Sequence, residues 1–340
     1  MLPRNSSGAE DLLGNSSDSR PGNVEQVLVP FFDVLILVLG LAGHSTVMFI
    51  LCRRHRKRAG QSAQSSMTET GTDVLLLALS SADLLLLATL PFHTAAIAMQ
   101  QWPFGDFLCR MAGFLGSACS SASAFTLSAL AVSRYMTVVH PATAYRLLSP
   151  RRVAMAATLL WVPACCLATP QFVFRSVGIL GTPPGRSDGL ACFAFLSHND
   201  QLIYGLFHFL LAFLLPLITI TIAYGNIYLF LWRTQNAGQA PQVERYQNKV
   251  TQTSAMLVLA FTLCWLPSYG LMLALLSDRS SGATGTSPRY GAFTVFSRLT
   301  AIASTVLNPM LYVLMSQKFR QDLLRLFKKE GHRASGGAAT

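Results

Sequence analysis

Asp83, an aspartate inside an apolar stretch, is a residue of this sequence whose type and position could serve chemistry. Asp83 lies within residues 72–98, a run rich in leucine and alanine. An ionisable side chain in the centre of a membrane helix costs several kcal/mol, so such residues usually mark functional sites. The alternative is an aspartate satisfied by hydrogen bonds alone. Asp83 is therefore a candidate functional residue.

The cysteines give no sign of a zinc site. There are seven of them, and neither a Cys-x-x-Cys pair nor a His/Cys ligand spacing is present. Most lie inside apolar runs, where a free cysteine packs as a small hydrophobic residue. No nucleophile–base pattern is visible either, so we do not expect an enzyme. The seven are Cys52, Cys109, Cys119, Cys165, Cys166, Cys192 and Cys264.

The composition indicates a membrane protein. Hydrophobic residues make up 51% of the 340 residues and charged residues only 12%, whereas soluble domains carry about a quarter charged residues. The net charge of +11 comes from short basic clusters between apolar runs. That distribution favours contact with anionic lipid over nucleic acid, which requires a concentrated basic face.

Seven apolar runs are long enough to cross a bilayer, which takes about 20 residues. We therefore predict an all-α membrane protein, a bundle of seven transmembrane helices. The third run is rich in Ser, Ala and Gly, which let neighbouring helices approach closely, and is predicted to be central. No internal repeat indicates a transporter. The runs are 27–52, 72–98, 106–135, 153–171, 202–232, 250–276 and 290–314.

The distribution of basic residues predicts the orientation. With the N-terminus outside, inner segments hold 18 Lys and Arg residues and outer segments hold 6, as the positive-inside rule requires. Residues 1–26 then form an extracellular tail, whose sequons at Asn5 and Asn15 are predicted glycosylation sites. Residues 27–314 form the membrane domain. The first inner loop, 53–71, is expected to be long and irregular.

Several motifs occur in order along these helices. Leu79–Asp83 matches LxxAD, Ser133–Tyr135 stands where Asp-Arg-Tyr is usual, Phe261–Pro267 matches FxxCWxP, and Asn308–Tyr312 matches NPxxY. Over residues 27–330 the chain thus resembles the class A, or rhodopsin-like, G-protein-coupled receptors. The resemblance implies a plasma-membrane receptor whose inner partner is a heterotrimeric G protein, with arrestin and a receptor kinase as further partners.

The resemblance also assigns residue roles. It implies a disulfide between Cys109 and Cys192, and a sodium ion held by Asp83 with Ser123, Ser304 and Asn308, which all offer oxygen atoms suited to a hard cation. No other cofactor is expected. The residues expected to switch the receptor and couple it to the G protein are Arg134, Tyr135, Pro216, Tyr224, Phe261, Trp265, Pro267, Asn308, Pro309 and Tyr312.

Residues 315–340 are predicted to form an amphipathic eighth helix followed by a cytoplasmic tail. Phe319, Leu323, Leu326 and Phe327 recur at helical spacing with basic residues between them. A helix of this kind lies in the membrane interface, with membrane lipid as its partner.

The expected ligand is a neuropeptide. Gly116 stands where amine receptors carry an aspartate, and no lysine is placed for retinal. The chain resembles the branch near galanin, kisspeptin and allatostatin receptors, through Trp102–Gly105, the outer loop 172–200 and Lys249–Thr251. The predicted ligand-binding residues are His93, Gln100, Ser117, Ser120, His208, Tyr269, Met272 and Arg298.

Two kinds of residue in this predicted pocket leave alternatives open. Arg298 could take a carboxylate bidentately, from an acidic peptide end or a small carboxylate ligand. It could equally reach Asp278 or loop carbonyls. His93 and His208 each fit a hydrogen-bonded core histidine as well as a ligand contact.

Two positions depart from the family pattern. His44 replaces an asparagine that normally bridges helices near Asp83, and Ser133 replaces the acidic neighbour of Arg134. Loss of that acid removes a charge-assisted restraint and predicts raised basal activity. Both changes leave room for an atypical or decoy receptor of the same fold. A transporter or channel is the other alternative.

Overall fold

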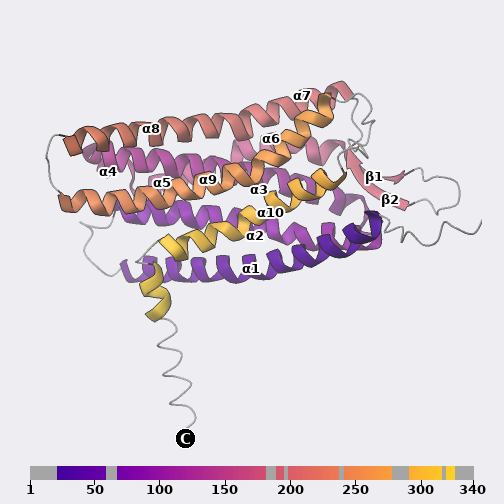
Figure 1. The fold of residues 1–340 in the computed structure, drawn as a ribbon, viewed down its shortest axis with the longest axis horizontal. Coiled ribbons are helices and arrows are strands. Elements are labelled where there is room, and N and C mark those ends of the chain that lie inside the picture. Colours follow the sequence, from indigo (N-terminus) through magenta and orange to yellow (C-terminus); the bar gives the residue numbers. More distant parts are fainter. Residues whose placement is uncertain are drawn as a thin grey trace, which may run out of the picture.

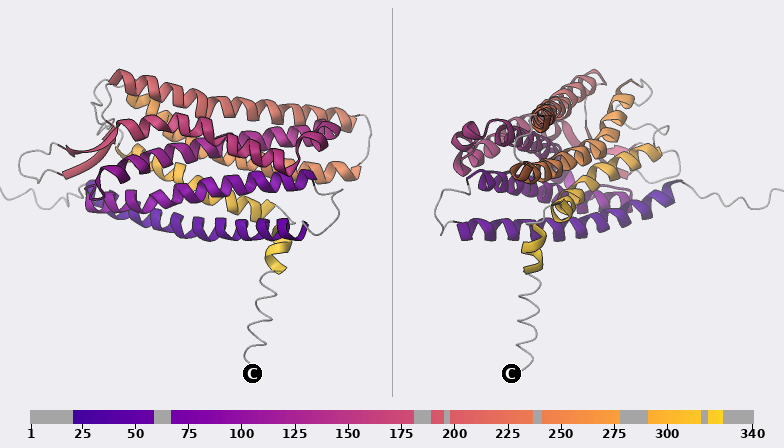
Figure 2. Two further views of the ribbon diagram at one scale, coloured as in Figure 1. Left: turned by 180° about the vertical axis from the view of Figure 1, so that it is seen from behind. Right: turned by 60° about the vertical axis from the view of Figure 1, so that its left-hand side comes forward.

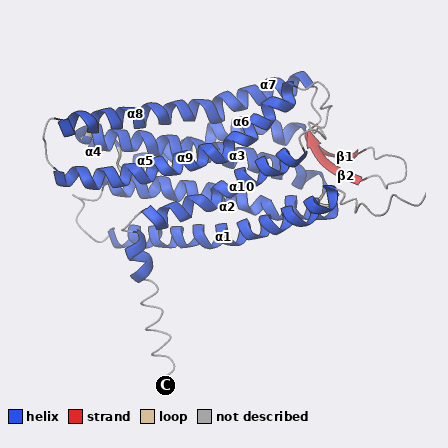
Figure 3. Ribbon diagram, viewed as in Figure 1, coloured by secondary structure: helices blue, strands red, loops and turns tan. Residues whose placement is uncertain are grey.

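The computed structural model describes residues 21–58, 67–180, 189–194, 198–236, 241–277, 291–315 and 319–325. Long helices lie side by side along one axis and form a single bundle, with a two-stranded hairpin at one end (Figure 1). Nearly all the described chain is helical (Figure 3). The elements are α1 (Pro21–Arg58), α2 (Met67–Met99), α3 (Gly105–Val139), α4 (Pro141–Leu147), α5 (Pro150–Leu159), α6 (Trp161–Phe174), β1 (Arg175–Leu180), β2 (Gly189–Ala194), α7 (His198–His208), η1 (Phe209–Leu214), α8 (Leu215–Asn236), α9 (Pro241–Ser277) and α10 (Gly291–Met315).

The predicted bundle of membrane helices is confirmed. Six helical segments of the described chain are long and apolar enough to cross a membrane, and they correspond to the first six predicted spans. The seventh, α10, has 25 residues and packs against α9 and α1. It carries Arg298 and Asn308, which lower its apolar character.

The third helix is central, as its small residues predict. Of the six segments, Gly105–Val139 has the largest buried share, 61%. It packs against α2, α6, α8 and α9, and Figure 2 shows the bundle from two further sides. Alanine and serine on α3 allow these close approaches, because they leave little side chain between the helix axes.

The inner loop predicted at 53–71 is wrong in extent. Helix α1 continues to Arg58 and α2 begins at Met67, so backbone helix takes up much of that stretch. Arginine and lysine are good helix formers and extend a membrane helix into the interface. The predicted tail 1–26 also loses its last six residues to α1, which starts at Pro21. Asn5 and Asn15 lie outside the described residues.

The regular α-helix is interrupted inside two of the membrane-length segments. The fourth span divides into α5 and α6 at Leu160, and the fifth contains the six-residue π-helical turn η1, directly before α8. Pro216 is the second residue of α8. A proline lacks an N–H donor and collides with the carbonyl four residues earlier, which widens the preceding turn.

The outer end of the bundle carries the hairpin. Strands β1 and β2 pair antiparallel, with Val177 opposite Cys192. The predicted disulfide between Cys109 on α3 and Cys192 on β2 is confirmed. The Trp102 backbone N–H also donates to the carbonyl of Leu190, at 2.7 Å. The hairpin is therefore anchored to α3 and to the turn before it.

A short helix at the opposite end corresponds to the predicted eighth helix. Residues 319–325 are helical. Phe319 is buried and Leu323 packs against the main core, as the amphipathic pattern predicts. The Arg54 guanidinium donates to Asp322 at 2.7 Å and lies over the Phe319 ring. Leu326 and Phe327 lie outside the described residues.

Candidate functional site

Asp83 lies at the centre of a buried polar cluster in the middle of the bundle. Its carboxylate accepts hydrogen bonds from Ser123 Oγ at 3.1 Å and from Asn308 Nδ2 at 2.7 Å. Asp83 belongs to α2, Ser123 to α3 and Asn308 to α10, and all three are buried. Their contact joins three helices that are far apart in the sequence. Both donors are neutral, so the negative charge of an ionised Asp83 is not balanced by them.

His44 takes the place of the asparagine expected in α1. Its Nε2–H donates to the carbonyl of Thr305 at 2.7 Å and lies 3.5 Å from Asp83 Oδ2. The ring is fully buried, and its Nδ1 has no hydrogen-bond partner among the described residues. Gly43 lets the helices approach here, since a Cβ at that position would lie 2.8 Å from Pro309. His44 thus bridges α1 to α10 despite the substitution.

Ser304 is linked to the switch tryptophan. The indole N–H of Trp265 donates to Ser304 Oγ at 3.2 Å, and Ser304 in turn donates to the carbonyl of Ala301. The four residues predicted for sodium therefore share one region: Asp83, Ser123 and Asn308 are hydrogen-bonded, and Ser304 faces Trp265. The buried carboxylate and the hydroxyl oxygens of Ser123 and Ser304 suit a hard monovalent cation, whereas Asn308 turns its Nδ2–H toward Asp83.

A run of aromatic contacts leads outward from Trp265. Phe261 lies 5.8 Å below it and Tyr269 6.3 Å above it, between ring centroids. Tyr269 also contacts Phe213 at 4.5 Å and stacks on His208 at 6.1 Å. These contacts connect α9 to η1 and to the end of α7.

The outer end of this run is hydrogen-bonded to α3. Ser117 Oγ lies 3.1 Å from His208 Nε2 and 3.5 Å from the Tyr204 hydroxyl. The predicted residues Ser117, His208 and Tyr269 are thus brought together. The His208 ring thus has partners within the protein. A contact between His208 and a ligand stays a prediction.

The other predicted pocket residues lie apart from one another. Ser120 is buried, and its hydroxyl donates to the Ser117 carbonyl of its own helix. Gln100 is exposed in the turn after α2, where its side chain donates to the carbonyl of Ile97. His93 faces Trp102 at 5.8 Å, and Met272 is half-buried on α9.

Arg298 has a different partner from those considered. Its guanidinium donates to both carboxylate oxygens of Asp33 on α1, at 3.0 and 2.7 Å. Thr94 of α2 adds a third hydrogen bond to the same carboxylate. Asp33 is 1% exposed. The bidentate carboxylate predicted for Arg298 is therefore supplied by the protein itself, and Asp278 lies outside the described residues.

Arg175 is a cation near the predicted ligand-binding residue His93, and sequence reasoning missed it as a site residue. It is the first residue of β1, and its side chain crosses Gly113 of α3. Burial lowers the pKa of Arg175, while the nearby Tyr204 acts in the opposite direction. A guanidinium nevertheless stays charged at neutral pH. The available signal was an arginine between the fourth span and Cys192, in the loop that the disulfide holds over α3.

The inner switch residues share one core. Tyr135, Tyr224, Phe261 and Trp265 all belong to the main apolar cluster of the bundle. Ser133 is buried and donates to the carbonyl of Leu130, one turn back in α3. Its hydroxyl therefore bonds its own helix. Pro267 and Pro309 lie inside α9 and α10, and the side chain of Tyr312 lies outside the described residues.

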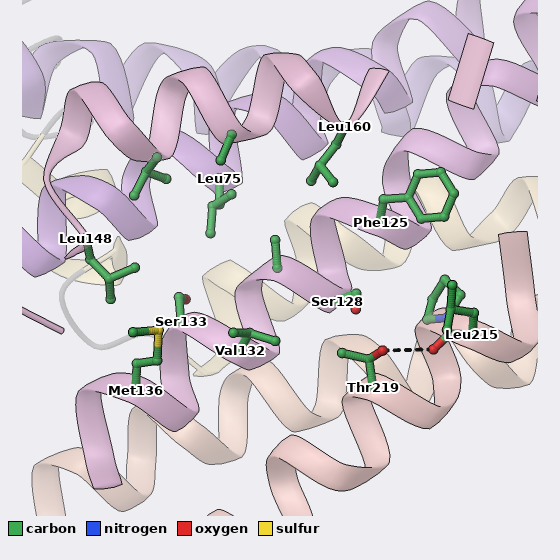
Figure 4. Close-up of a pocket in the computed structure, with 14 residues that line it drawn as sticks. Leu75, Phe125, Ser128, Val132, Ser133, Met136, Leu148, Leu160, Leu215 and Thr219 are labelled. Atoms are coloured by element: carbon green, nitrogen blue, oxygen red, sulfur yellow. Dashed lines mark hydrogen bonds between the residues drawn. The ribbon is translucent and has the colours of Figure 1, made fainter. Parts of the chain in front are cut away.

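An apolar cavity of about 330 Å³ lies at the inner half of the bundle. It is bordered by α3, α5 and α8, with Leu75 of α2 and Leu148 (Figure 4). Ser133 and the switch residue Pro216 line it from two sides. Its lining is almost entirely apolar, so it offers space to a hydrocarbon group.

Comparison with known proteins agrees with this architecture. Residues 43–312 match the family described as 7 transmembrane receptor (rhodopsin family). Galanin receptor type 2 of Mus musculus is 30% identical, over 99% of this chain and 86% of the relative. Galanin receptor type 3 of Mus musculus is 32% identical over 95% and 84%. Somatostatin receptor type 4 of Rattus norvegicus is 29% identical over 90% and 74%. The chain belongs to the rhodopsin family of seven-transmembrane receptors.

Proposed function

We propose that this chain is a plasma-membrane receptor for an extracellular neuropeptide and that it signals through a heterotrimeric G protein. Its relatives are named for galanin and for somatostatin, which supports a peptide ligand. Membership in a receptor family and six membrane-length helical segments make it a multi-pass membrane protein. The extracellular end carries the hairpin and its disulfide.

The observation that carries the proposal is the continuous path of contacts through the bundle. It starts at His208 and Tyr269 near the outer end, passes through Trp265, and reaches Ser304. Ser304 lies one helical turn before Asn308 on α10, and Asn308 donates to Asp83. Phe261 lies on the other side of Trp265. Packed cores have discrete arrangements rather than continuous ones, so a ligand that shifts one ring can shift the population of the whole set.

At the inner end, Arg134 is the proposed contact with the G protein. It lies on α3 beside Ser133 and Tyr135, close to the helix end at Val139. In the proposed active state the inner half of α9 moves outward and opens access to Arg134. Arrestin and a receptor kinase are proposed to recognise the same opened surface. The eighth helix is proposed to lie on lipid, with Leu324 exposed toward it.

Sodium is proposed as an allosteric ion at Asp83. The ion would be held by Asp83 with oxygen atoms of Ser123, Ser304 and Asn308, and it would supply the positive charge that the neutral donors lack. The hydrogen bonds from Ser123 and Asn308 to Asp83 join α2, α3 and α10 around this position. Glycosylation of Asn5 and Asn15 is a further proposal.

The test is a screen of neuropeptides on cells that express the chain. Galanin, somatostatin and a panel of amidated and acidic peptides are applied, and G-protein dissociation is followed together with ion flux. Peptide-dependent dissociation that is absent from untransfected cells supports the proposal. Peptide uptake without dissociation would favour a decoy receptor, and flux without dissociation would favour a transporter or channel.

A further inference from the structure

The fold holds the Arg175 side chain against α3, near the outer end of the bundle. It follows directly on α6 and opens β1, whose partner β2 is bonded to α3 through Cys192. A Cβ built on Gly113 would lie 2.6 Å from Arg175 Cδ and 3.1 Å from Nε. The side chain therefore passes over α3 through the space that a glycine leaves.

The guanidinium has no carboxylate partner among the described residues. Its polar side-chain contact is with Cys192 Sγ, 3.8 Å from Nη1, and its buried Nε has no hydrogen-bond partner in the described chain. By contrast, Arg54, Arg110 and Arg298 each donate to an aspartate. A buried charge is costly unless it is paired, so an unpaired guanidinium gains much from an anion that arrives with a ligand.

The surroundings of Arg175 leave room for such an anion. It lies within electrostatic range of Tyr204 on α7 and of His93 on α2. One turn deeper on α3, a Cβ on Gly116 would meet no atom within 4 Å. The space beside Gly116, three residues after Gly113 on α3, is therefore open.

The charge balance of this region is positive. Arg298 also acts on His93, but its charge is balanced by Asp33. Asp106 is engaged by Arg110 at 2.6 Å and by the backbone N–H of Val177. Asp33 and Asp106 are therefore each engaged by another arginine.

We infer that Arg175 is the anion-recognition residue of the ligand site and takes a carboxylate of the peptide, from an acidic side chain or a free C-terminus. The inference rests on the proposed function, because it presumes a peptide ligand. A guanidinium presents two parallel N–H donors that match both oxygens of a carboxylate, and the contact is strongest where water is excluded. This role replaces the one predicted for Arg298.

The test uses two synthetic libraries of randomised short peptides, one with free C-terminal carboxylates and one amidated. Both are bound to the purified full chain in lipid discs, and the recovered sequences are compared with the input. Wild type is expected to enrich acidic residues or free carboxylates about tenfold, which corresponds to one charge-assisted contact. Arg175→Gln is expected to lose that enrichment. Arg151→Gln, which removes an exposed arginine at the inner end, is expected to keep it.

Two more variants keep the test sharp if Arg175→Gln folds poorly. Arg175→Lys keeps the charge without the fork and is expected to retain a weakened preference. Gly113→Ala leaves the arginine in the sequence but displaces its side chain, and is expected to lower the enrichment as well.

A wild type without acidic preference, or a preference unchanged in both Arg175→Gln and Gly113→Ala, would overturn the inference. The proposed function fails separately: binders with the acidic preference that never stimulate nucleotide exchange on a G protein would contradict signalling and leave the role of Arg175 intact.

Discussion

The guanidinium of Arg298 donates a hydrogen bond to each carboxylate oxygen of Asp33, and this pair joins α10 to α1. The distances are 3.0 and 2.7 Å, and Thr94 of α2 donates to the same carboxylate. Asp33 is buried, whereas the Arg298 side chain is 25% exposed. The contact joins α10 to α1 at the outer half of the bundle and gives Arg298 a carboxylate partner from the protein itself.

Breaking this pair is expected to destabilise the receptor. Asp33→Asn and Arg298→Gln should each cost about 1–3 kcal/mol, less than a fully buried pair because Arg298 is partly exposed. The double variant should cost less than the sum, since neither change then leaves an unpaired charge. Thermal unfolding of the purified chain in lipid discs measures all three. Strictly additive losses would show that the two residues do not interact.

Sodium is expected to stabilise the chain through Asp83. In a thermal unfolding series, sodium chloride should raise Tm above potassium chloride at equal ionic strength, because an ion that binds only the folded state stabilises it. Asp83→Asn should abolish the difference, since the carboxylate supplies the charge. This readout needs no ligand.

His44 gives the sodium prediction its matched control. His44→Asn restores the amide usual in the family and removes a ring nitrogen 3.5 Å from Asp83. The sodium effect should persist or grow, because a neutral amide cannot compete for the carboxylate as a protonated imidazole can. A sodium effect that Asp83→Asn leaves unchanged would place the ion elsewhere.

Ser133 is expected to leave the inactive state weakly restrained. Its hydroxyl bonds the Leu130 carbonyl, whereas an aspartate at that position would hold Arg134 by a charge-assisted bond. Ser133→Asp should therefore lower basal nucleotide exchange several-fold, with Ser133→Ala as the control that stays near wild type. Both are compared at matched surface levels without ligand. Equal basal exchange in wild type and Ser133→Asp would contradict the hypothesis.

Ser304 is expected to tune the switch tryptophan. Ser304→Ala removes the acceptor of the Trp265 indole N–H, an interaction of about 1 kcal/mol. The indole should then leave its present packing more often, and basal exchange should rise a few-fold. Thr300→Ala, on the same helix but bonded only to backbone carbonyls, should leave basal exchange unchanged. Equal basal exchange in Ser304→Ala and wild type would show that the hydrogen bond between Trp265 and Ser304 does not restrain the switch.

The helices were predictable because their signal is local. Apolar length alone placed the spans, and motifs at fixed depth placed Asp83 with Ser123 and Asn308. The ends were less predictable: the basic residues after Cys52 read as a loop, yet they continue α1 to Arg58. Interfacial helix extension depends on the membrane surface rather than on hydrophobic periodicity.

The outer site was harder to predict because its contacts are not local. Asp33 and Arg298 are 265 positions apart, and no motif links them. Asp33 nevertheless lies in an apolar run, so the reasoning that singled out Asp83 would have found it. Arg175 depends on the register of the hairpin and on the disulfide, neither of which a span analysis supplies.

Guanine-nucleotide exchange in a reconstituted system tests the central claim most directly. The purified chain is placed in lipid vesicles with a heterotrimeric G protein, and exchange is followed on addition of the peptides that bind it. We predict that at least one peptide accelerates exchange and that Arg134→Ala abolishes the acceleration while peptide binding persists. Bound peptide that leaves exchange unchanged, or acceleration that survives Arg134→Ala, would contradict the account.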